Sequence, residues 1–287
     1  SHIDETPFGV TLGSSGITPL EMSVCFGVMA NGGVYQAPIS VLGISDSEGN
    51  VVWDGHANQT RRRVFSEATS WMIVDMLKDA VSGGTGTSAK ISGQTVAGKT
   101  GTNSDQKGMT GYYSSALWVG HDNYKALSSK STGSGAAAPL WQAYMKKIHQ
   151  GLSNRDILDG DPSQYGLVKA TTCAVSGQLA TDACANDAKG YGTVTDWWAQ
   201  GTVPTTYCQM HKTQSVCAET GDLASPYCPN VISRGVIVIP SGHPLYKFIG
   251  TEYESVLSQY LGSSATIKYD GSGSVISGGQ VCTVHGA

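Results

Sequence analysis

The segment Ala97-Gly98-Lys99-Thr100-Gly101-Thr102 constrains the fold of this chain more than any other stretch. It closes a strand-like run over residues 94–102, and a second strand-like run over residues 112–121 follows it. We expect the two runs to be antiparallel neighbours, joined by a polar loop over residues 103–111. Glycine inside a strand usually marks a place where another backbone or a ligand approaches closely. The segment therefore predicts a sheet in which a ligand or another stretch of backbone closely approaches one strand.

This strand carries groups suited to binding a carboxylate. Lys99 supplies a positive charge, and Thr100 and Thr102 lie two residues apart, so their hydroxyl groups project to the same side. If the strand lies at a sheet edge, its free N–H and C=O groups can pair with an extended peptide. The alternative is a plain strand and turn with a solvated Lys99. A Lys-Thr-Gly triplet alone favours that alternative, because short motifs occur by chance.

Helical patterns flank the strands on both sides. Thr18 is positioned to cap a first helix, Ser66 caps a second, and a third begins at residue 138. One face of the third helix holds Leu140, Tyr144 and Ile148. Between the first two helices, residues 34–44 and 50–53 predict a hairpin. Strands in the middle with helices before and after indicate an α+β arrangement.

Composition narrows the classes of function. The 287 residues suffice for one large or two modest domains, and a hydrophobic content of 40% suffices for a packed core. The net charge of −4 gives no electrostatic case for binding nucleic acid. No apolar run is long enough to span a membrane, and no signal peptide is visible. Because the chain enters a domain-like pattern directly after Ser1-His2, we expect it to be a piece of a longer polypeptide.

The seven cysteines are unevenly distributed. Cys25 lies alone among apolar helix residues and is expected to be a buried, free thiol. The other six lie in the second half of the chain, namely Cys173, Cys184, Cys208, Cys217, Cys228 and Cys282. Six cysteines in a loop-rich region predict disulfides and an extracytoplasmic compartment, although the sequence does not give their pairing.

Two other kinds of site, a zinc site and a phosphate-binding loop, have weaker support in the sequence. Cys208 and His211 have the spacing of half a zinc site, but no second half at a standard spacing accompanies them, so disulfides are favoured and no metal is expected. The glycine-rich loop over residues 83–86 lacks the Gly-Lys-Ser/Thr ending of a phosphate-binding loop. We expect no cofactor.

Several segments, taken together and in order, resemble the class A penicillin-binding proteins of bacteria. They are Gly16-Ile17-Thr18-Pro19-Leu20-Glu21-Met22, Met29-Ala30-Asn31-Gly32-Gly33-Val34-Tyr35, Met76-Leu77-Lys78-Asp79-Ala80-Val81, Gly84-Thr85-Gly86-Thr87, Val96 to Asn103, Leu117-Trp118-Val119-Gly120 and Ala138-Pro139-Leu140-Trp141. Lys-Thr-Gly is the third of the three motifs of such serine acyltransferases, alongside S-x-x-K and S-x-N. The stretches over residues 173–184 and 201–211 resemble the tail that follows the transpeptidase domain in some members.

The resemblance implies an α+β fold with two parts. Residues 1–150 would form the C-terminal portion of a β-lactamase-like transpeptidase domain, with an antiparallel sheet and flanking helices. Residues 151–170 would be a linker, and residues 171–287 a small, disulfide-containing, β-rich extension. Beyond residue 211 the resemblance gives no guide.

The resemblance also implies a function, which is peptidoglycan cross-linking by a serine D,D-transpeptidase. Stem peptides ending in D-Ala-D-Ala and β-lactams would be the ligands. Lys99 would attract the substrate carboxylate and help to hold the catalytic network, and Thr100 and Thr102 would hydrogen-bond that carboxylate. The backbone N–H of Thr102 would contribute to the oxyanion hole, and Gly101 would permit close approach. The site would lie outside the cytoplasm, with the parent protein anchored in the membrane.

The chain departs from the family in lacking the other two motifs. Ser104-Asp105-Gln106-Lys107 matches S-x-x-K in letters only, because that motif must open a buried helix and this one is expected in a polar loop. We therefore expect a companion chain from the same precursor that carries S-x-x-K and S-x-N. It would dock so that its serine faces Lys99 and Thr102, covering an apolar face that includes Leu117 and Val119.

Two further functions stay open. The chain could belong to a related penicillin-recognising serine hydrolase, either a D,D-carboxypeptidase or a β-lactamase-like enzyme. It could also be a non-catalytic fragment whose residues 171–287 bind the cell wall or a partner. Trp197-Trp198 could then stack on sugar rings, or instead pack against the tail's own core.

Overall fold

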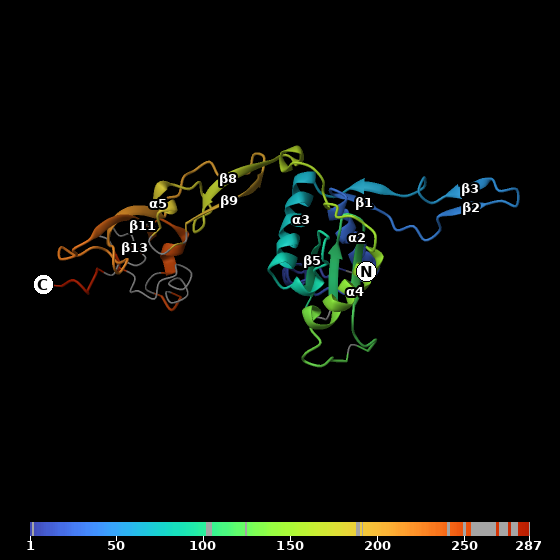
Figure 1. The fold of residues 1–287 in the computed structure, drawn as a ribbon, viewed down its shortest axis with the longest axis horizontal. Coiled ribbons are helices and arrows are strands. Elements are labelled where there is room, and N and C mark those ends of the chain that lie inside the picture. Colours follow the sequence, from blue (N-terminus) through green and yellow to red (C-terminus); the bar gives the residue numbers. More distant parts are fainter. Residues whose placement is uncertain are drawn as a thin grey trace. The chain divides into compact units, whose positions relative to one another are not determined.

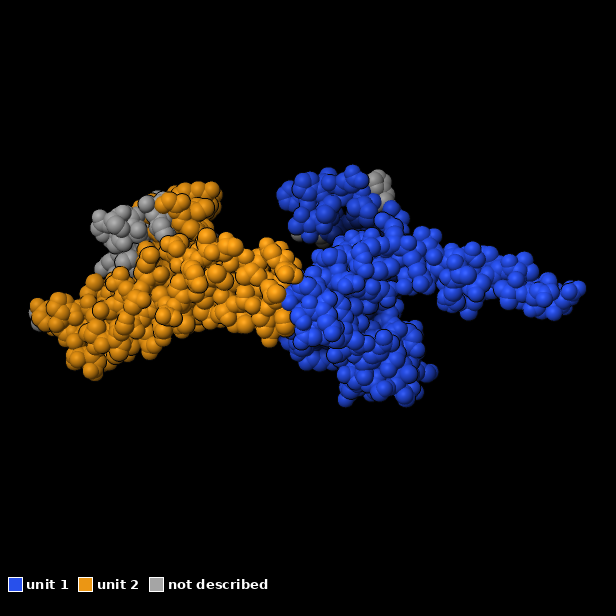
Figure 2. Space-filling view, turned by 90° about the horizontal axis from the view of Figure 1, so that it is seen from above, with its two compact units in different colours: residues 1–167 blue, residues 168–287 orange. Residues whose placement is uncertain are grey.

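The computed structural model describes residues 1, 3–101, 105–123, 125–187, 190, 192–239, 242–248, 251–253, 268–269, 275–276 and 281–286. The chain divides into two compact units, unit 1 over residues 1–167 and unit 2 over residues 168–287 (Figure 2). Unit 1 contains helices around a small sheet, whereas unit 2 is mostly β-structure (Figure 1).

The central sheet of unit 1 has three antiparallel strands. They are β5 (Ala97–Gly101), β6 (Asp105–Met109) and β7 (Ser114–Trp118), in the order β5-β6-β7. The prediction that the first and last of these are neighbours is wrong, because β6 lies between them in the segment expected to be a polar loop. The strand is hard to recognise because its buried residues include Gln106 and Gly108, while Lys107 neutralises Asp105 in an ion pair.

Four helices accompany the sheet. They are α1 (Pro7–Leu12), α2 (Pro19–Ala30), α3 (Glu67–Ser82) and α4 (Ala138–Ile148). The predicted caps are confirmed: Thr18 and Glu21 form a reciprocal capping box, and the Ser66 hydroxyl accepts a hydrogen bond from the backbone of Thr69. Helix α2 packs on β7, and α3 packs beside β5. Among the helices of the described residues, none combines the length and apolar character that crossing a bilayer requires.

Of the face of helix α4 that the sequence suggested, only Ile148 packs against the core. Leu140 and Tyr144 are 55% and 54% exposed, whereas Trp141 and Met145 are fully buried. The reason is the sheet beneath the helix: a Cβ added at Gly108 would lie only 2.7 Å from the Trp141 ring, so the glycine makes room for the indole. Leu117 packs against the buried cluster that contains Trp141 and Met145, so unit 1 itself covers this side chain.

Two short strand pairs lie outside the central sheet. Strand β1 (Val34–Gln36) pairs with β4 (Arg61–Arg63), and β2 (Gly43–Ser45) pairs with β3 (Val51–Asp54). The predicted hairpin is thus confirmed only for its outer part, since its first residues pair with the arginine strand instead. Short helical turns η1 (Thr87–Ala89), η2 (Gly133–Ala137) and η3 (Pro162–Tyr165) complete the unit.

Most of the segment expected to be a linker is packed onto unit 1. Gln94 donates a side-chain hydrogen bond to the carbonyl of Leu152 at 2.8 Å, and the Thr95 N–H donates to Asn154 Oδ1 at 2.7 Å. Ile157 is buried in the cluster that includes Met109. Residues 151–167 therefore belong to unit 1, and the division between the units falls between residues 167 and 168.

Unit 2 is built from small sheets. Strand β8 (Leu167–Cys173) pairs with β9 (Thr193–Ala199), and a second sheet has the order β10-β11-β13-β12. The members of the second sheet are β10 (His211–Cys217), β11 (Val231–Ile239), β12 (Lys268–Tyr269) and β13 (Val275–Ile276). Helix α5 (Asp182–Ala185) and the turn η4 (Pro244–Phe248) add the only helical pieces in the described part of this unit. The β-rich character expected from the sequence is confirmed.

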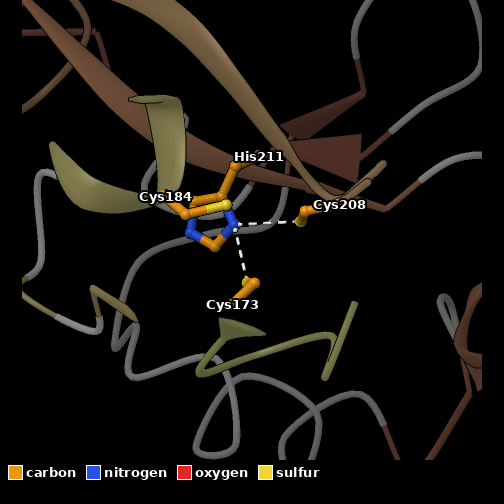
Figure 3. Close-up of side chains that lie close together, drawn as sticks. All are labelled: Cys173, Cys184, Cys208 and His211. Carbon is orange, nitrogen blue, oxygen red and sulfur yellow. Dashed lines mark hydrogen bonds between the residues drawn. The ribbon is translucent and has the colours of Figure 1, made fainter. Parts of the chain in front are cut away.

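The predicted disulfides are not formed, because all seven cysteines are free thiols. The six in unit 2 gather in two clusters of three, and each cluster also holds one histidine. Cluster I consists of Cys173, Cys184, Cys208 and His211 (Figure 3), and cluster II consists of Cys217, Cys228, Cys282 and His285. An odd number of thiols in each cluster is incompatible with complete pairing inside it.

The prediction for Cys25 is half right. Its thiol is free, as expected, but it is exposed rather than buried. Helix α2 instead buries Phe26 and Val28, so its sequence neighbour Cys25 points away from the core.

Candidate active site

Strand β5 is the outermost strand on one side of the central sheet that the described residues form, which is the position that pairing with a peptide requires. Within the described part of the chain its one strand partner is β6, and its register there pairs Lys99 with Lys107. The backbone groups along its other edge have no strand to pair with among these residues. An edge strand of this kind can accept an extended peptide as an added strand.

Lys99 is the exposed cation of this strand. Its Nζ donates a hydrogen bond to the carbonyl of Thr100 at 2.8 Å, and no carboxylate of the described residues lies within ion-pairing distance. Lys107, its cross-strand neighbour, differs in that the Asp105 carboxylate neutralises it. Of the two paired lysines, Lys99 alone therefore keeps a charge that can be offered to an incoming anion.

Thr100 is held by a contact that the sequence did not reveal. Its hydroxyl donates to the hydroxyl of Thr85 at 3.1 Å, which links β5 to the turn after α3. Thr85 belongs to the segment Gly84-Thr85-Gly86-Thr87. In the sequence, only the resemblance to penicillin-binding proteins had drawn attention to this segment. In this structure the single proton of the Thr100 hydroxyl is therefore directed at Thr85, and it could reach a carboxylate only after this bond opens.

The end of β5 is closely surrounded. A Cβ at Gly101 would collide with the Asp105 carboxylate, and a Cβ at Gly133 would lie 2.8 Å from the Asp105 carbonyl. In this structure the group that approaches Gly101 is the Asp105 carboxylate, and the close approach of a substrate at Gly101 stays a prediction. Gly133 begins η2, and nothing in the sequence marked it as a neighbour of the site.

The structure brings Lys99, Thr100 and Gly101 together on one edge strand, and Thr102 lies outside the described residues. The same holds for Ser104. Asp105, Gln106 and Lys107 form part of β6, so the S-x-x-K letters do not open a helix and their rejection as a nucleophile motif is supported.

Unit 2 holds ionisable groups with strongly shifted pKa values. Burial opposes ionisation of Cys208, but hydrogen bonds from Ser176 and His211 outweigh it and lower the pKa of the thiol to about 6. Burial likewise disfavours the charged form of His211, but the hydrogen bond with Asp187 outweighs it and raises the pKa of the imidazole to about 9. The two shifts share one cause, which is that the Cys208 thiol and the His211 imidazole lie within hydrogen-bonding distance of each other.

Comparison with protein families matches both units. The family model of the penicillin binding protein transpeptidase domain matches residues 3–126, which include β5 and Lys99. The family model of the penicillin-binding protein 1A C-terminal domain matches residues 164–213, which include all four residues of cluster I.

Curated relatives match along both units as well. The chain is 32% identical over 223 residues to penicillin-binding protein 1A of Clostridium botulinum, covering 76% of this chain and 26% of that protein. It is 33% identical over 207 residues to penicillin-binding protein 1A of Clostridium perfringens, covering 70% of this chain and 24% of that protein. The chain thus spans about a quarter of the length of these relatives.

Solved structures give partial matches. The penicillin-binding protein PonA1 from Mycobacterium tuberculosis aligns with a TM-score of 0.44 at 22% identity, over 50% of this chain and 41% of that chain. The D,D-transpeptidase domain of a peptidoglycan glycosyltransferase from Eggerthella lenta aligns with a TM-score of 0.39 at 27% identity, over 47% of this chain and 33% of that chain.

Proposed function

Because this chain belongs to the penicillin-binding protein family, we propose that it contributes the substrate-binding strand of a serine D,D-transpeptidase that cross-links peptidoglycan. The observation that carries the proposal is Lys99, an exposed lysine without a carboxylate partner in the described part of the chain, on the edge strand β5. A stem peptide would add to that edge as an extended strand, with its terminal carboxylate near Lys99.

Each predicted residue has a separate role in this proposal. Lys99 provides the positive potential that attracts the carboxylate and helps to hold the catalytic network, while Thr100 and Thr102 donate hydrogen bonds to the carboxylate. The backbone N–H of Thr102 stabilises the developing oxyanion. Gly101 keeps the strand free of a Cβ where the donor peptide approaches. The Thr100 hydroxyl, which donates to Thr85 in this structure, would turn to the carboxylate when the peptide binds.

The reaction itself is an acyl transfer in two steps. A serine oxygen attacks the carbonyl carbon of the penultimate D-Ala, the amide bond breaks, and the terminal D-Ala leaves as the amine after taking up the serine proton. An amine of a second stem peptide then attacks the ester carbonyl, the new amide forms, and the serine hydroxyl is restored. A β-lactam would follow the first step only, since its amine stays tethered to the acyl group.

The attacking serine belongs to the S-x-x-K motif, for which the described residues offer no suitable helix. We propose that transpeptidase sequence beyond these 287 residues supplies it, together with S-x-N. The comparisons do not support a separate companion polypeptide, so a nicked enzyme stays a hypothesis, as do membrane anchoring of the parent protein and an extracytoplasmic site.

The alternatives differ in what they predict for the acyl-enzyme. A penicillin-recognising hydrolase would pass the acyl group to water, so the adduct would be lost rapidly. A wall-binding module would form no adduct at all. For the latter, Trp197 offers limited support, because Lys169 Nζ already lies 4.8 Å from the centre of its ring.

Acylation by a labelled penicillin tests the proposal. The chain would be produced together with the transpeptidase segment that carries the serine, and labelling would be followed by mass spectrometry and gel fluorescence. Lys99→Ala should reduce the acylation rate at least about 100-fold, as expected for loss of a group that binds the reacting ligand. The control Lys90→Ala removes an exposed lysine outside β5 and should leave the rate unchanged. Equal rates in the two variants would refute the role of β5.

A further inference from the structure

Unit 2 contains an internal repeat. The pattern Cys-Ala-x-x-Gly-x-Leu-Ala-Thr/Ser-x-x-Cys occurs at residues 173–184 and again at residues 217–228. Each copy is followed by Cys-x-x-His, at residues 208–211 for the first and 282–285 for the second. Every residue of clusters I and II therefore occupies an equivalent place in one of two copies of the same motif.

The two copies also share their backbone structure. The N–H of Cys173 donates to the carbonyl of Gln178, and the N–H of Cys217 donates to the carbonyl of Asp222, both at 2.8 Å. The third cysteine of each copy is likewise tied to the motif leucine. The pairs, again at 2.8 Å, are Cys208 N–H to the Leu179 carbonyl and Cys282 N–H to the Leu223 carbonyl. A fold built twice around the same four side chains indicates that these side chains have one common purpose.

In both clusters the donor atoms converge. His211 Nδ1 lies 3.3 Å from Cys173 Sγ and 3.5 Å from Cys208 Sγ (Figure 3). His285 Nδ1 lies 3.5 Å from Cys217 Sγ and 3.3 Å from Cys282 Sγ. The four donor atoms of each cluster lie within 4.8 Å of one another. Tetrahedral zinc with ordinary Zn–S and Zn–N bonds separates sulfur from nitrogen by about 3.6 Å, which agrees with these distances.

The opposite ring nitrogen of each histidine is held by a carboxylate. His211 Nε2 lies 3.1 Å from Asp187 Oδ2, and His285 Nε2 lies 3.2 Å from Glu219 Oε2. A carboxylate on one nitrogen fixes the ring orientation and leaves the other nitrogen to a metal, as is usual for metal-bound histidine. The arrangement appears twice, with carboxylates that come from different positions of the two copies.

Backbone N–H groups point at the sulfur atoms as well. Val175 and Ser176 approach Cys173 Sγ at 3.4 Å, and Thr181 approaches Cys184 Sγ at 3.4 Å. In the second copy Ser225 approaches Cys228 Sγ at 3.3 Å. Such donors stabilise negative charge on sulfur, which a thiolate ligand carries and a disulfide does not.

Disulfide formation accounts poorly for this geometry. Each cluster has three cysteines, so one disulfide inside a cluster would leave the third thiol unpaired. It would also leave unexplained why the histidine is oriented toward the sulfur atoms. Four protein ligands of the type Cys3His satisfy a tetrahedral metal completely and leave no open position for a substrate. Thiolate and imidazole donors in this geometry favour zinc over the oxygen-preferring cations.

We propose that unit 2 binds two zinc ions, one in cluster I and one in cluster II, and that both are structural. Cluster I would bind through Cys173, Cys184, Cys208 and His211, and cluster II through Cys217, Cys228, Cys282 and His285. Each ion joins the ends of one copy of the motif, which are far apart in the sequence, and so replaces the disulfides that the sequence suggested.

Elemental analysis of the 287-residue chain, purified without chelators, tests the proposal. The wild type should contain about two zinc ions per chain, and Cys208→Ser and Cys282→Ser should each contain about one. The control Cys25→Ser removes the cysteine outside both clusters and should retain both ions. Alkylation of the unfolded, unreduced chain should find all seven thiols free.

A second measurement covers variants that fail to fold. Cobalt added to the metal-free wild type should give the absorption of tetrahedral thiolate-bound Co²⁺, with saturation at two equivalents and displacement by zinc. Fewer than about 0.2 zinc ions per chain together with disulfide-bonded cysteines would overturn the proposal, as would two ions retained in Cys208→Ser. These readouts need no penicillin, so their failure leaves the proposed transpeptidase function untouched.

Discussion

The two units bury different kinds of side chain. Unit 1 is stabilised by large apolar groups, among them Trp141, Met145, Val74 and Met109, which helices and sheet bury together. Unit 2 buries several aliphatic side chains, but five of its six cysteines are buried with them. Unit 1 thus obtains its stability from apolar area, whereas unit 2 concentrates metal-binding donors where a larger domain would place leucine and phenylalanine. The difference predicts that one treatment should unfold one unit and spare the other.

Metal removal should have the largest effect. A structural zinc site in a small domain contributes roughly 10–16 kcal/mol of apparent binding free energy, most of which is folding free energy. Chelation should therefore unfold unit 2 and leave unit 1 folded, because no cluster of the kind in unit 2 occurs among the described residues of unit 1. Limited proteolysis with and without chelator checks this, since a fragment close to residues 1–167 should survive. Survival of residues 168–287 under chelation would contradict the account.

Loss of a core indole should have the next largest effect, and only on unit 1. Trp141→Ala should destabilise unit 1 by about 3–5 kcal/mol, because the side chain is fully buried against Gly108. Its neighbour Leu140 is 55% exposed, so Leu140→Ala should cost about 0.5 kcal/mol or less. Chemical denaturation followed by circular dichroism measures both changes. If zinc content fell in Trp141→Ala, the independence of the two units would be wrong.

The carboxylates that contact the two histidines allow a comparison between the two clusters. Asp187 and His211 have side chains that are 1% and 0% exposed, whereas Glu219 and His285 are 55% and 18% exposed. Asp187→Asn should weaken zinc binding at cluster I by about 10–100-fold, and Glu219→Gln should weaken binding at cluster II by less, because water screens the exposed pair. Competition with a coloured chelator gives both affinities. An equal loss of zinc affinity in the two variants would show that burial of the carboxylate does not determine how much it strengthens zinc binding.

The capping box of α2 offers a smaller change within unit 1. Thr18→Ala removes the hydroxyl that accepts from Glu21 N–H at 3.2 Å and should destabilise unit 1 by about 1 kcal/mol. Thr18→Ser, which keeps the hydroxyl, is the matched control. Thermal unfolding should show the loss in the alanine variant alone, with zinc content unchanged in both.

Local patterns in the sequence predicted part of this structure. The Thr18 cap and the β-rich second unit both follow from residues close together in the chain, and the structure confirms them. Strand β6 was missed because an ion pair between Asp105 and Lys107 and a buried Gln106 give it the composition of a loop. Tertiary packing decides such cases, and propensity does not reveal it.

The clusters were missed for a different reason. Cys184 and Cys208 are 24 positions apart and Cys228 and Cys282 are 54 apart, so neither cluster has the spacing of a familiar zinc motif. The internal repeat was nevertheless visible in the sequence. It would have divided the six cysteines into two sets of three with one histidine each, and that odd number argues against complete pairing.

Hydrogen exchange, resolved along the chain and measured with and without chelator, tests the division between the two units most directly. The account predicts that amides of β10 and β11 lose protection when metal is removed, while those of β5, β6 and β7 keep theirs. Unchanged protection in β10 and β11, or an equal loss in both units, would contradict it.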